Sequence, residues 1–480
     1  MNPRKIVLFI FFTLSILLAV TFLSKSYIRE GEGRESGFEL GKLFIKYPTV
    51  SEFLLTNKPE VNTRADSVIS IIEKSIPVEE FVPSIPDFSS IDTSEVLRIQ
   101  YPGNKSDFTA RLKSQLESGT CRILHYGDSQ LEGDRISGYL RNRLQGIYGG
   151  NGPGFIPVKQ VYNQVSADVI CSDNWLRFAV FDPTQPKLAH KEYGLYASLS
   201  RFTPFDHTTV DSLTIQSLPP VKADIQINPS AKSYARLKSF SKIGLHYGNA
   251  VYPVSIKVFN NGQLIKEGNL IADNNYHCYE IITDGRSGEI HIELESICSP
   301  DFYGLTLDGN SGISLDNIAM RGSSGTVFSG MKAGIFSRMA GLLNPEIIIF
   351  QYGGNTVPYV KDSVAIDNYA RYLMGHINWV RRFMPDASII FIGPTDMSTM
   401  ENGEMVTYQL LPYLNDKLRS TCLKNGIAYW SMYEAMGGKN SMPFWVEQKL
   451  AANDYTHFSP QGTKIISELF FTALYLDLAQ

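Results

Sequence analysis

The most constraining stretch of this sequence is an apolar run that ends in a turn bearing a serine. Residues 122–126 predict a buried strand, the pattern breaks at Gly127, and Ser129 stands where a helix is expected to begin. That helix is indicated by residues at mostly three- and four-residue spacing: Ile136, Tyr139, Leu140, Arg143 and Leu144. A strand–turn–helix unit holds a side chain rigidly, and N–H groups at a helix start favour developing negative charge. Gly-Asp-Ser alone is also typical of an ordinary helix cap, so a reactive Ser129 needs partners elsewhere in the chain.

Alternation of strands and helices returns after residue 313. The pattern predicts strands at 313–320, 346–351, 388–392 and 427–430, and helices at 328–343, 369–383, 410–425 and 460–478. With the strand at 122–126, this predicts an α/β domain of flavodoxin-like, three-layer type with a parallel five-stranded sheet in the order 2-1-3-4-5. We expect the domain in two parts, residues 105–160 and 313–480.

The intervening residues 161–312 show a period of two. Apolar and polar residues alternate along 255–259 and 289–294, and hairpin-type turns stand at 260–262 and 284–288. About 150 residues of this kind predict an inserted all-β sandwich domain. Five aromatic residues of the block form either a sugar-stacking platform or part of its core: Trp175, Tyr193, Tyr196, Phe202 and Tyr303.

The N-terminal region differs in composition from the rest. Within residues 1–24, Arg4 and Lys5 precede an apolar run from Ile6 to Leu23 with few polar interruptions. This run predicts a signal anchor with its basic end in the cytoplasm, or a cleaved signal peptide; both place the body outside the inner membrane. Residues 25–104 contain repeated prolines and one short helical candidate, so we interpret them as a linker or tether.

Composition argues against several classes of partner. The formal net charge is −4 and there is no long basic run, so the charge gives no reason to expect binding to nucleic acid. The histidines and cysteines lack metal-ligand spacing, and the glycine-rich run 149–154 follows a helix rather than a strand, so we expect no metal and no cofactor. Cys278 and Cys298 lie in neighbouring strand-like runs and either pair or remain buried thiols.

Polar residues gather at the predicted carboxyl ends of the strands, where an open parallel sheet binds its ligands. Ser129, Gly322 and Asn355 follow three strands that the expected order makes neighbours. Asp454 and His457 stand directly before the last helix. A carboxylate three residues before a histidine can hold its Nδ1 and leave Nε2 free to take the proton of a serine. These positions together indicate a serine hydrolase site.

Four blocks carry a resemblance to the SGNH (GDSL-type) hydrolases, in the order of that family: Gly127-Asp-Ser129, the glycine that ends Asn317-Ile-Ala-Met-Arg-Gly322, Gly353-Gly-Asn355 and Asp454-x-x-His457. The resemblance implies that Ser129 is the nucleophile, His457 the general base and acid, and Asp454 the residue that orients the imidazole. It implies an oxyanion hole formed by the N–H groups of Ser129 and Gly322 and the side-chain amide of Asn355.

Two positions depart from the family pattern. Gln130 replaces the usual leucine after the serine, and Thr356 replaces the usual aspartate after Asn355. Neither change removes a reacting group. His125 also lies near the site, and we interpret it as a packed neighbour rather than a catalytic residue.

The inserted β block, the export segment and the runs 133–141 and 149–154 resemble the bacterial peptidoglycan O-acetylesterases, whose insertion is like a carbohydrate-binding module. This implies a serine esterase that removes the C6 O-acetyl group of N-acetylmuramic acid through an acetyl-serine intermediate, with an acetylated glycan polymer as substrate and the inner membrane as anchor. Three alternatives stay open: an acetyl esterase of another polysaccharide, an O-acetyltransferase with the same triad, and a non-catalytic glycan-binding protein.

Overall fold

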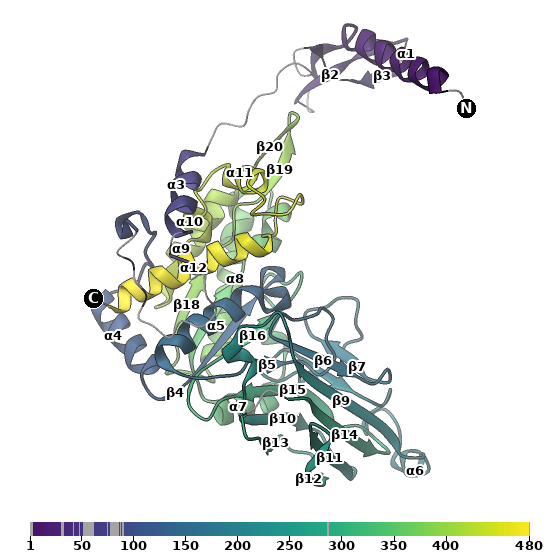
Figure 1. The fold of residues 1–480 in the computed structure, drawn as a ribbon, viewed down its shortest axis with the longest axis vertical. Helices are drawn as coiled ribbons and strands as arrows, with labels where there is room; N and C mark the ends of the chain where they lie inside the picture. The colour runs from purple at the N-terminus through teal and green to yellow at the C-terminus, as the bar shows by residue number, and fades with distance from the viewer. Residues whose placement is uncertain are drawn as a thin grey trace.

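A five-stranded parallel sheet forms the centre of the molecule (Figure 1). The computed structural model describes residues 3–29, 33–41, 43–47, 49–50, 62–73, 75–76, 86, 88, 91–285 and 288–479. The strands lie in the order β16 (Gly312–Ala319), β4 (Thr120–Gly127), β17 (Pro345–Gln351), β18 (Ser388–Ile392) and β21 (Ala428–Trp430). All neighbouring pairs are parallel, and the order confirms the predicted 2-1-3-4-5 arrangement.

Helices cover both faces of this sheet and complete three layers. One face carries α4 (Lys105–Leu116), α5 (Arg135–Tyr148) and α12 (Pro460–Leu478), and the other carries α7 (Ala333–Leu343), α8 (Ser363–Arg381) and α9 (Leu411–Lys424). Successive residues of β4 serve both layers, because Ile123 packs with the first group and Leu124 with the second. Burial on both faces explains why these strands are continuous apolar runs.

Two antiparallel sheets are inserted between α5 and β16. The first has the order β13-β10-β15-β8-β7, with β5 paired to β15, and the second has the order β12-β11-β14-β9-β6. Their strands are β5 (Gly154–Ile156), β6 (Ala167–Cys171), β7 (Leu176–Ala179), β8 (Ser198–Arg201), β9 (Val221–Pro229), β10 (Lys242–Gly248), β11 (Val254–Asn260), β12 (Gln263–Leu270), β13 (His277–Ile282), β14 (Ile290–Ser296) and β15 (Asp301–Asp308). Ile225, Leu245 and Ile292 belong to one core that the two sheets share. Because β5 pairs with β15, the sandwich begins before the expected boundary at residue 161.

Short elements complete the described chain. They are α6 (Ser212–Gln216), α10 (Met432–Ala435), α11 (Ser441–Glu447) and the hairpin β19 (Ser398–Glu401) and β20 (Glu404–Thr407). The 3-10 segments are η1 (Thr93–Glu95), η2 (Ser129–Asp134), η3 (Ala235–Lys238), η4 (Phe328–Gly330) and η5 (Gly354–Tyr359). Both η2 and η5 begin just beyond strands of the central sheet, so they carry residues toward its carboxyl edge.

The aromatic residues considered for a sugar platform lie in the core. Trp175, Tyr193, Tyr196, Phe202 and Tyr303 are each at most 1% exposed. Trp175 packs edge-on against Phe202 and Phe302, with ring centroids 5.4 and 5.3 Å apart. The platform interpretation is therefore wrong, because these rings pack inside the fold instead of facing solvent. All five cysteines, including Cys278 and Cys298, are free thiols.

Residues 25–104 were expected to form a linker or tether, but segments in the second half of this range belong to the folded body. The helix α3 (Thr63–Ile72) buries Ala65, Ile69 and Ile72 in the core that includes α12. Further along, the backbone of Gln100 exchanges hydrogen bonds of 2.8 Å with Tyr429 and so extends the edge of the central sheet at β21. These residues belong to the folded body because their apolar side chains cover surface that the central domain would otherwise expose.

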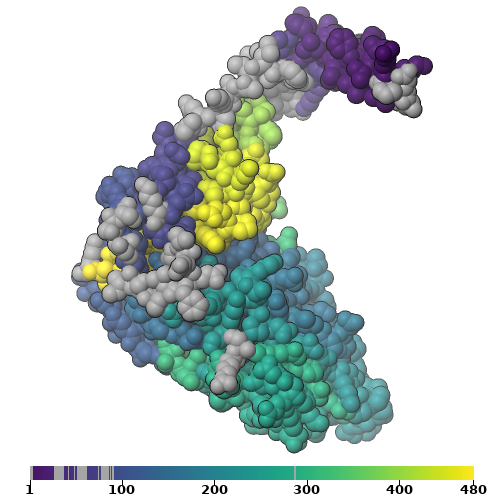
Figure 2. All heavy atoms as spheres, viewed as in Figure 1, coloured from purple at the N-terminus to yellow at the C-terminus, as the bar shows by residue number. Residues whose placement is uncertain are grey.

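The N-terminal residues form a separate small unit. The helix α1 (Pro3–Thr21) precedes a three-stranded antiparallel sheet of β1 (Lys25–Arg29), β2 (Gly33–Leu40) and β3 (Leu43–Lys46), a sheet that was not expected within the linker. Figure 2 shows the purple helix away from the body. Its window Arg4–Thr21 has a mean hydropathy of 2.0 and is 6% buried, so by length and composition it is a candidate membrane anchor.

Candidate active site

The turn after β4 is tight and presents Ser129 at the start of η2. A Cβ at Gly127 would lie 2.6 Å from the Leu131 side chain, which explains why glycine is needed there. The Asp128 carboxylate accepts a hydrogen bond of 3.0 Å from the Gln130 N–H and caps the turn. The regular helix α5 begins only at Arg135, so the serine stands on a 3-10 segment instead of directly on the predicted helix.

The structure brings Ser129, His457 and Asp454 into one hydrogen-bonded relay. Ser129 Oγ lies 2.8 Å from His457 Nε2. On the other side of the ring, His457 Nδ1 lies 2.8 Å from Asp454 Oδ2. This is the geometry that lets an imidazole remove a proton from a hydroxyl while a carboxylate holds the ring. The two atoms that meet at the serine belong to residues 328 positions apart in the chain.

The loop before α12 sets the orientation of His457. Asp454 Oδ1 accepts hydrogen bonds of 3.0 Å from the backbone N–H groups of both Thr456 and His457. Partial burial raises the pKa of Asp454, but the hydrogen bonds from the backbone and side chain of His457 outweigh it and leave the pKa below its usual value. The carboxylate therefore stays ionised at neutral pH.

Ser129, His457 and Asn355 line the same cavity, which has a volume of about 50 Å³. The amide Nδ2 of Asn355 donates to the Ser323 carbonyl at 3.1 Å, which fixes the side chain beside the loop after β16. Gly322 lies in that loop, directly before Ser323, with a positive φ of 74°. It is exposed and outside the set of residues that line the cavity. Three of the five predicted site residues thus line the cavity; Asp454 contacts it through His457, and Gly322 lies on the adjoining turn.

Two neighbours of the serine add features that the motifs did not indicate. Asp128 is buried against the cavity, and burial raises the pKa of its carboxyl to about 6. Gln130, noted in the sequence only as a departure, donates from Nε2 to the Thr456 carbonyl at 2.7 Å. This bond joins the serine turn to the histidine loop. The sequence feature that could have indicated this bond is the amide side chain at position 130, where the family pattern has an apolar residue directly after the serine.

His125 lies inside the core, in agreement with its interpretation as a packed neighbour. Its ring nitrogens lie 3.2 Å from Gln351 Oε1 and 3.0 Å from Ser137 Oγ. Burial lowers the pKa of His125 to about 3, so the ring is neutral. Within the described part of the chain, no group of three or more His, Cys, Asp or Glu side chains is placed to hold a metal ion.

Comparisons with known proteins identify solved structures that are similar to this chain. No family model and no curated protein sequence matches the chain. A solved peptidoglycan O-acetylesterase matches with 20% identity and a TM-score of 0.59, over 79% of this chain and 99% of that one. A family two carbohydrate esterase from Clostridium thermocellum matches with 12% identity and a TM-score of 0.23, over 53% and 93% of the two chains. A putative GDSL-like lipase from Bacteroides ovatus matches with 11% identity and a TM-score of 0.22, over 62% and 94%.

The first of these likenesses establishes the architecture. The chain has the fold of an SGNH hydrolase, with a parallel central sheet interrupted by a β sandwich. At the carboxyl edge of this sheet, Ser129, His457 and Asp454 are joined by hydrogen bonds in the geometry of a serine–histidine–aspartate triad.

Proposed function

We propose that this protein is a serine esterase that removes O-acetyl groups from a glycan of the cell envelope, with peptidoglycan as its substrate. The observation that carries the proposal is the relay from Asp454 through His457 to Ser129 in a cavity shared with Asn355. The match to a peptidoglycan O-acetylesterase over most of both chains supports the choice of glycan.

In the proposed reaction, Ser129 Oγ attacks the carbonyl carbon of the acetyl ester while His457 Nε2 takes the hydroxyl proton. Negative charge then develops on the carbonyl oxygen. The proposed donors to this oxygen are the Ser129 N–H, the Asn355 side-chain amide and the Gly322 N–H. His457 returns its proton to the departing sugar oxygen. Water next attacks the acetyl-serine with His457 as the base, which releases acetate and restores the enzyme.

The proposed location is outside the inner membrane. The helix α1 is long and apolar enough to cross a membrane, with Arg4 and Lys5 at its start. A basic N-terminal flank favours the cytoplasmic side, so the anchor interpretation leaves the esterase domain in the compartment that contains the glycan.

The change that tests this function is Ser129→Ala in the full-length protein. We expect the loss of the nucleophile to lower acetate release from O-acetylated peptidoglycan and from 4-nitrophenyl acetate by roughly 10⁴-fold or more. The measurement is enzymatic quantification of acetate, with circular dichroism to verify folding.

The matched control is Ser337→Ala, which removes a hydroxyl that donates to Gly334 within α7, away from the cavity. This variant should keep full activity. Undiminished acetate release by the Ser129 variant would remove the serine from its proposed role. A wild-type protein that acts on acetylated xylan and not on peptidoglycan would overturn the substrate assignment alone.

A further inference from the structure

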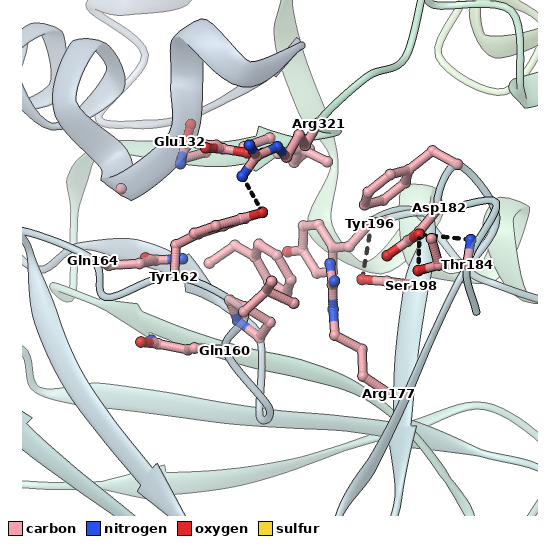
Figure 3. Close-up of a pocket in the computed structure, with 18 of the residues that line it drawn as sticks. Glu132, Gln160, Tyr162, Gln164, Arg177, Asp182, Thr184, Tyr196, Ser198 and Arg321 are labelled. Atoms are coloured by element: carbon pink, nitrogen blue, oxygen red, sulfur yellow. Dashed lines mark hydrogen bonds and ion pairs between the residues drawn. The ribbon is translucent and has the colours of Figure 1, made fainter.

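A second and larger cleft lies between the hydrolase domain and the β sandwich (Figure 3). Its volume is about 420 Å³, against about 50 Å³ for the cavity at Ser129. Glu132 and Arg321 form the wall on the hydrolase side, and Tyr162 and Arg177 belong to the sandwich side. The cleft adjoins the proposed active site through the chain itself, because Glu132 shares η2 with Ser129 and Arg321 directly precedes Gly322.

Arg177, on β7, directs its guanidinium group into the cleft (Figure 3). Its Nε is buried and has no hydrogen-bond partner. In the described part of the molecule, the guanidinium has no ion pair either, and its contact is with the Phe181 ring, 5.5 Å from the centroid. Burial lowers the pKa of Arg177, although an arginine remains charged at any physiological pH. Arg177 as a whole is only partly buried, and the Asp182 carboxylate acts on it through space without an ion pair or hydrogen bond, so its guanidinium can still pair with an anionic group in the cleft.

The two acidic residues that line the cleft have other hydrogen-bond or ion-pair partners, although the Asp182 carboxylate also raises the pKa of Arg177 through space. Asp182 Oδ1 accepts from the backbone N–H and the hydroxyl of Thr184, at 2.9 and 2.7 Å. Glu132 Oε1 lies 3.6 Å from Arg321 Nε, and Arg321 also donates to the Tyr162 hydroxyl. Arg321 is therefore held by Glu132 and Tyr162, whereas Arg177 Nε has no hydrogen-bond partner among the described residues.

Two amide side chains provide further unused polar groups. Gln160 Nε2 and Gln164 Oε1 line the cleft, are buried, and have no hydrogen-bond partner. The Tyr162 ring, whose side chain is 40% exposed, offers an aromatic face beside them. A free donor, a free acceptor and an aromatic face suit a sugar with hydroxyl or N-acetyl groups.

We propose that this interdomain cleft binds the part of the substrate that carries a carboxylate, and that Arg177 pairs with that carboxylate. The substrate class is then an acetylated acidic glycan, with the acid on the sugar that bears the ester or on its neighbour. The inference rests on the proposed esterase function and deepens it. In peptidoglycan, the carboxylate belongs either to the lactyl group of muramic acid or to a stem peptide.

The test compares two small substrates that differ in one charge. These are 6-O-acetyl-N-acetylmuramic acid with its lactyl carboxylate free, and the methyl ester of that carboxylate. We expect wild-type kcat/KM to favour the acid by roughly 10- to 100-fold, because a charge-assisted pair at a partly buried guanidinium is lost in the methyl ester. Arg177→Gln should abolish this preference through KM.

Two further variants make the result unambiguous. Arg382→Gln removes an arginine that lies 5.8 Å from the Phe383 ring outside the cleft, so it should keep the wild-type preference. Arg177→Lys retains the charge without the planar fork, so part of the preference should remain, and this variant decides the matter if Arg177→Gln does not fold. A preference that persists without Arg177, or a wild-type enzyme that treats both substrates alike, would overturn the inference.

Polymeric substrates identify the source of the carboxylate. One sample is O-acetylated peptidoglycan whose stem peptides have been removed, and the others carry stem peptides with free or amidated carboxylates. Dependence on Arg177 for the first sample assigns the lactyl group, and dependence only for free peptide carboxylates assigns the stem peptide. No dependence in any sample would refute the proposal. If wild-type protein releases no acetate even from 4-nitrophenyl acetate, the esterase function itself fails.

Discussion

At the scale of single residues, the amide of Gln130 is the least expected part of the site. It stands next to Ser129 and donates at 2.7 Å to the carbonyl of Thr456, the residue before His457. The bond ties together the two loops that meet in the relay. A leucine at this position would fill a similar volume but leave that carbonyl without its donor. We therefore regard Gln130 as a positioning residue that limits motion of the histidine loop.

Gln130→Leu tests this role. Loss of one neutral hydrogen bond of about 1 kcal/mol from the alignment of the loop should lower kcat on 4-nitrophenyl acetate by roughly fivefold, with KM nearly unchanged. Steady-state kinetics measures both constants. Gln115→Leu is the control, since it removes a similar side-chain bond of 3.1 Å to the Asp386 carbonyl, on α4. Equal kcat values for wild type and the Gln130 variant would show that the loop holds its geometry without this bond.

At the scale of elements, α3 makes the chain before residue 105 part of the fold. Asn62 caps the helix by accepting from the Ala65 N–H at 2.9 Å. Ala65 lies so close to Gly437 that a Cβ on the glycine would be 2.7 Å from it. Ile69 and Ile72 then pack into the core that contains α12. The helix therefore contributes to the stability of the hydrolase domain.

We expect Ile72→Ala to lower the free energy of unfolding by about 2–5 kcal/mol, because Ile72 is fully buried and the truncation leaves a cavity. Urea denaturation followed by tryptophan fluorescence measures the change. Ser70→Ala, on the exposed face of the same helix, should change stability by less than about 0.5 kcal/mol. If both variants unfold alike, the helix is not docked in solution and the tether interpretation applies after all.

At the scale of the whole molecule, a buried charge network joins the two domains. Arg122 on β4 donates to both oxygens of Asp316 on β16, at 2.7 and 2.9 Å, and also to Asp308 on β15 of the sandwich. The Tyr196 hydroxyl and the Phe155 N–H, both from the insertion, donate to Asp316 at 3.1 and 3.0 Å. Contacts of this kind make the sandwich continuous with the sheet instead of a loosely attached module.

This network predicts that both domains unfold in one transition in scanning calorimetry. Arg122→Met should lower stability by about 3–5 kcal/mol, because it leaves two buried carboxylates without their cation. Lys222→Met is the control: its pair with Glu295 spans 4.0 Å and the lysine side chain is 82% exposed, so little change is expected. Separate transitions for sheet and sandwich in the wild type would contradict the interlocked arrangement.

Local patterns in the sequence were sufficient to predict strands and helices of the hydrolase domain. The predicted strand at 388–392 and helix at 460–478 have those same bounds in the structure, where Ser459 accepts from the Gly462 N–H as the helix cap. Periodicity and capping depend on residues within a few positions of each other, so sequence alone reveals them. The motif order also led to Ser129, Asn355, Asp454 and His457, whose meeting is seen only in three dimensions.

The amino-acid order thus determined the strands, the helices, their alternation and the identity of the candidate reacting groups. Tertiary packing decided three other matters: that the aromatic residues of the insertion are core, that α3 belongs to the body, and that Arg177 lines a cleft between two domains with its Nε unbonded. The physical reason is that burial and pairing depend on which surfaces meet. Those surfaces come from segments hundreds of positions apart, so no local pattern contains the information.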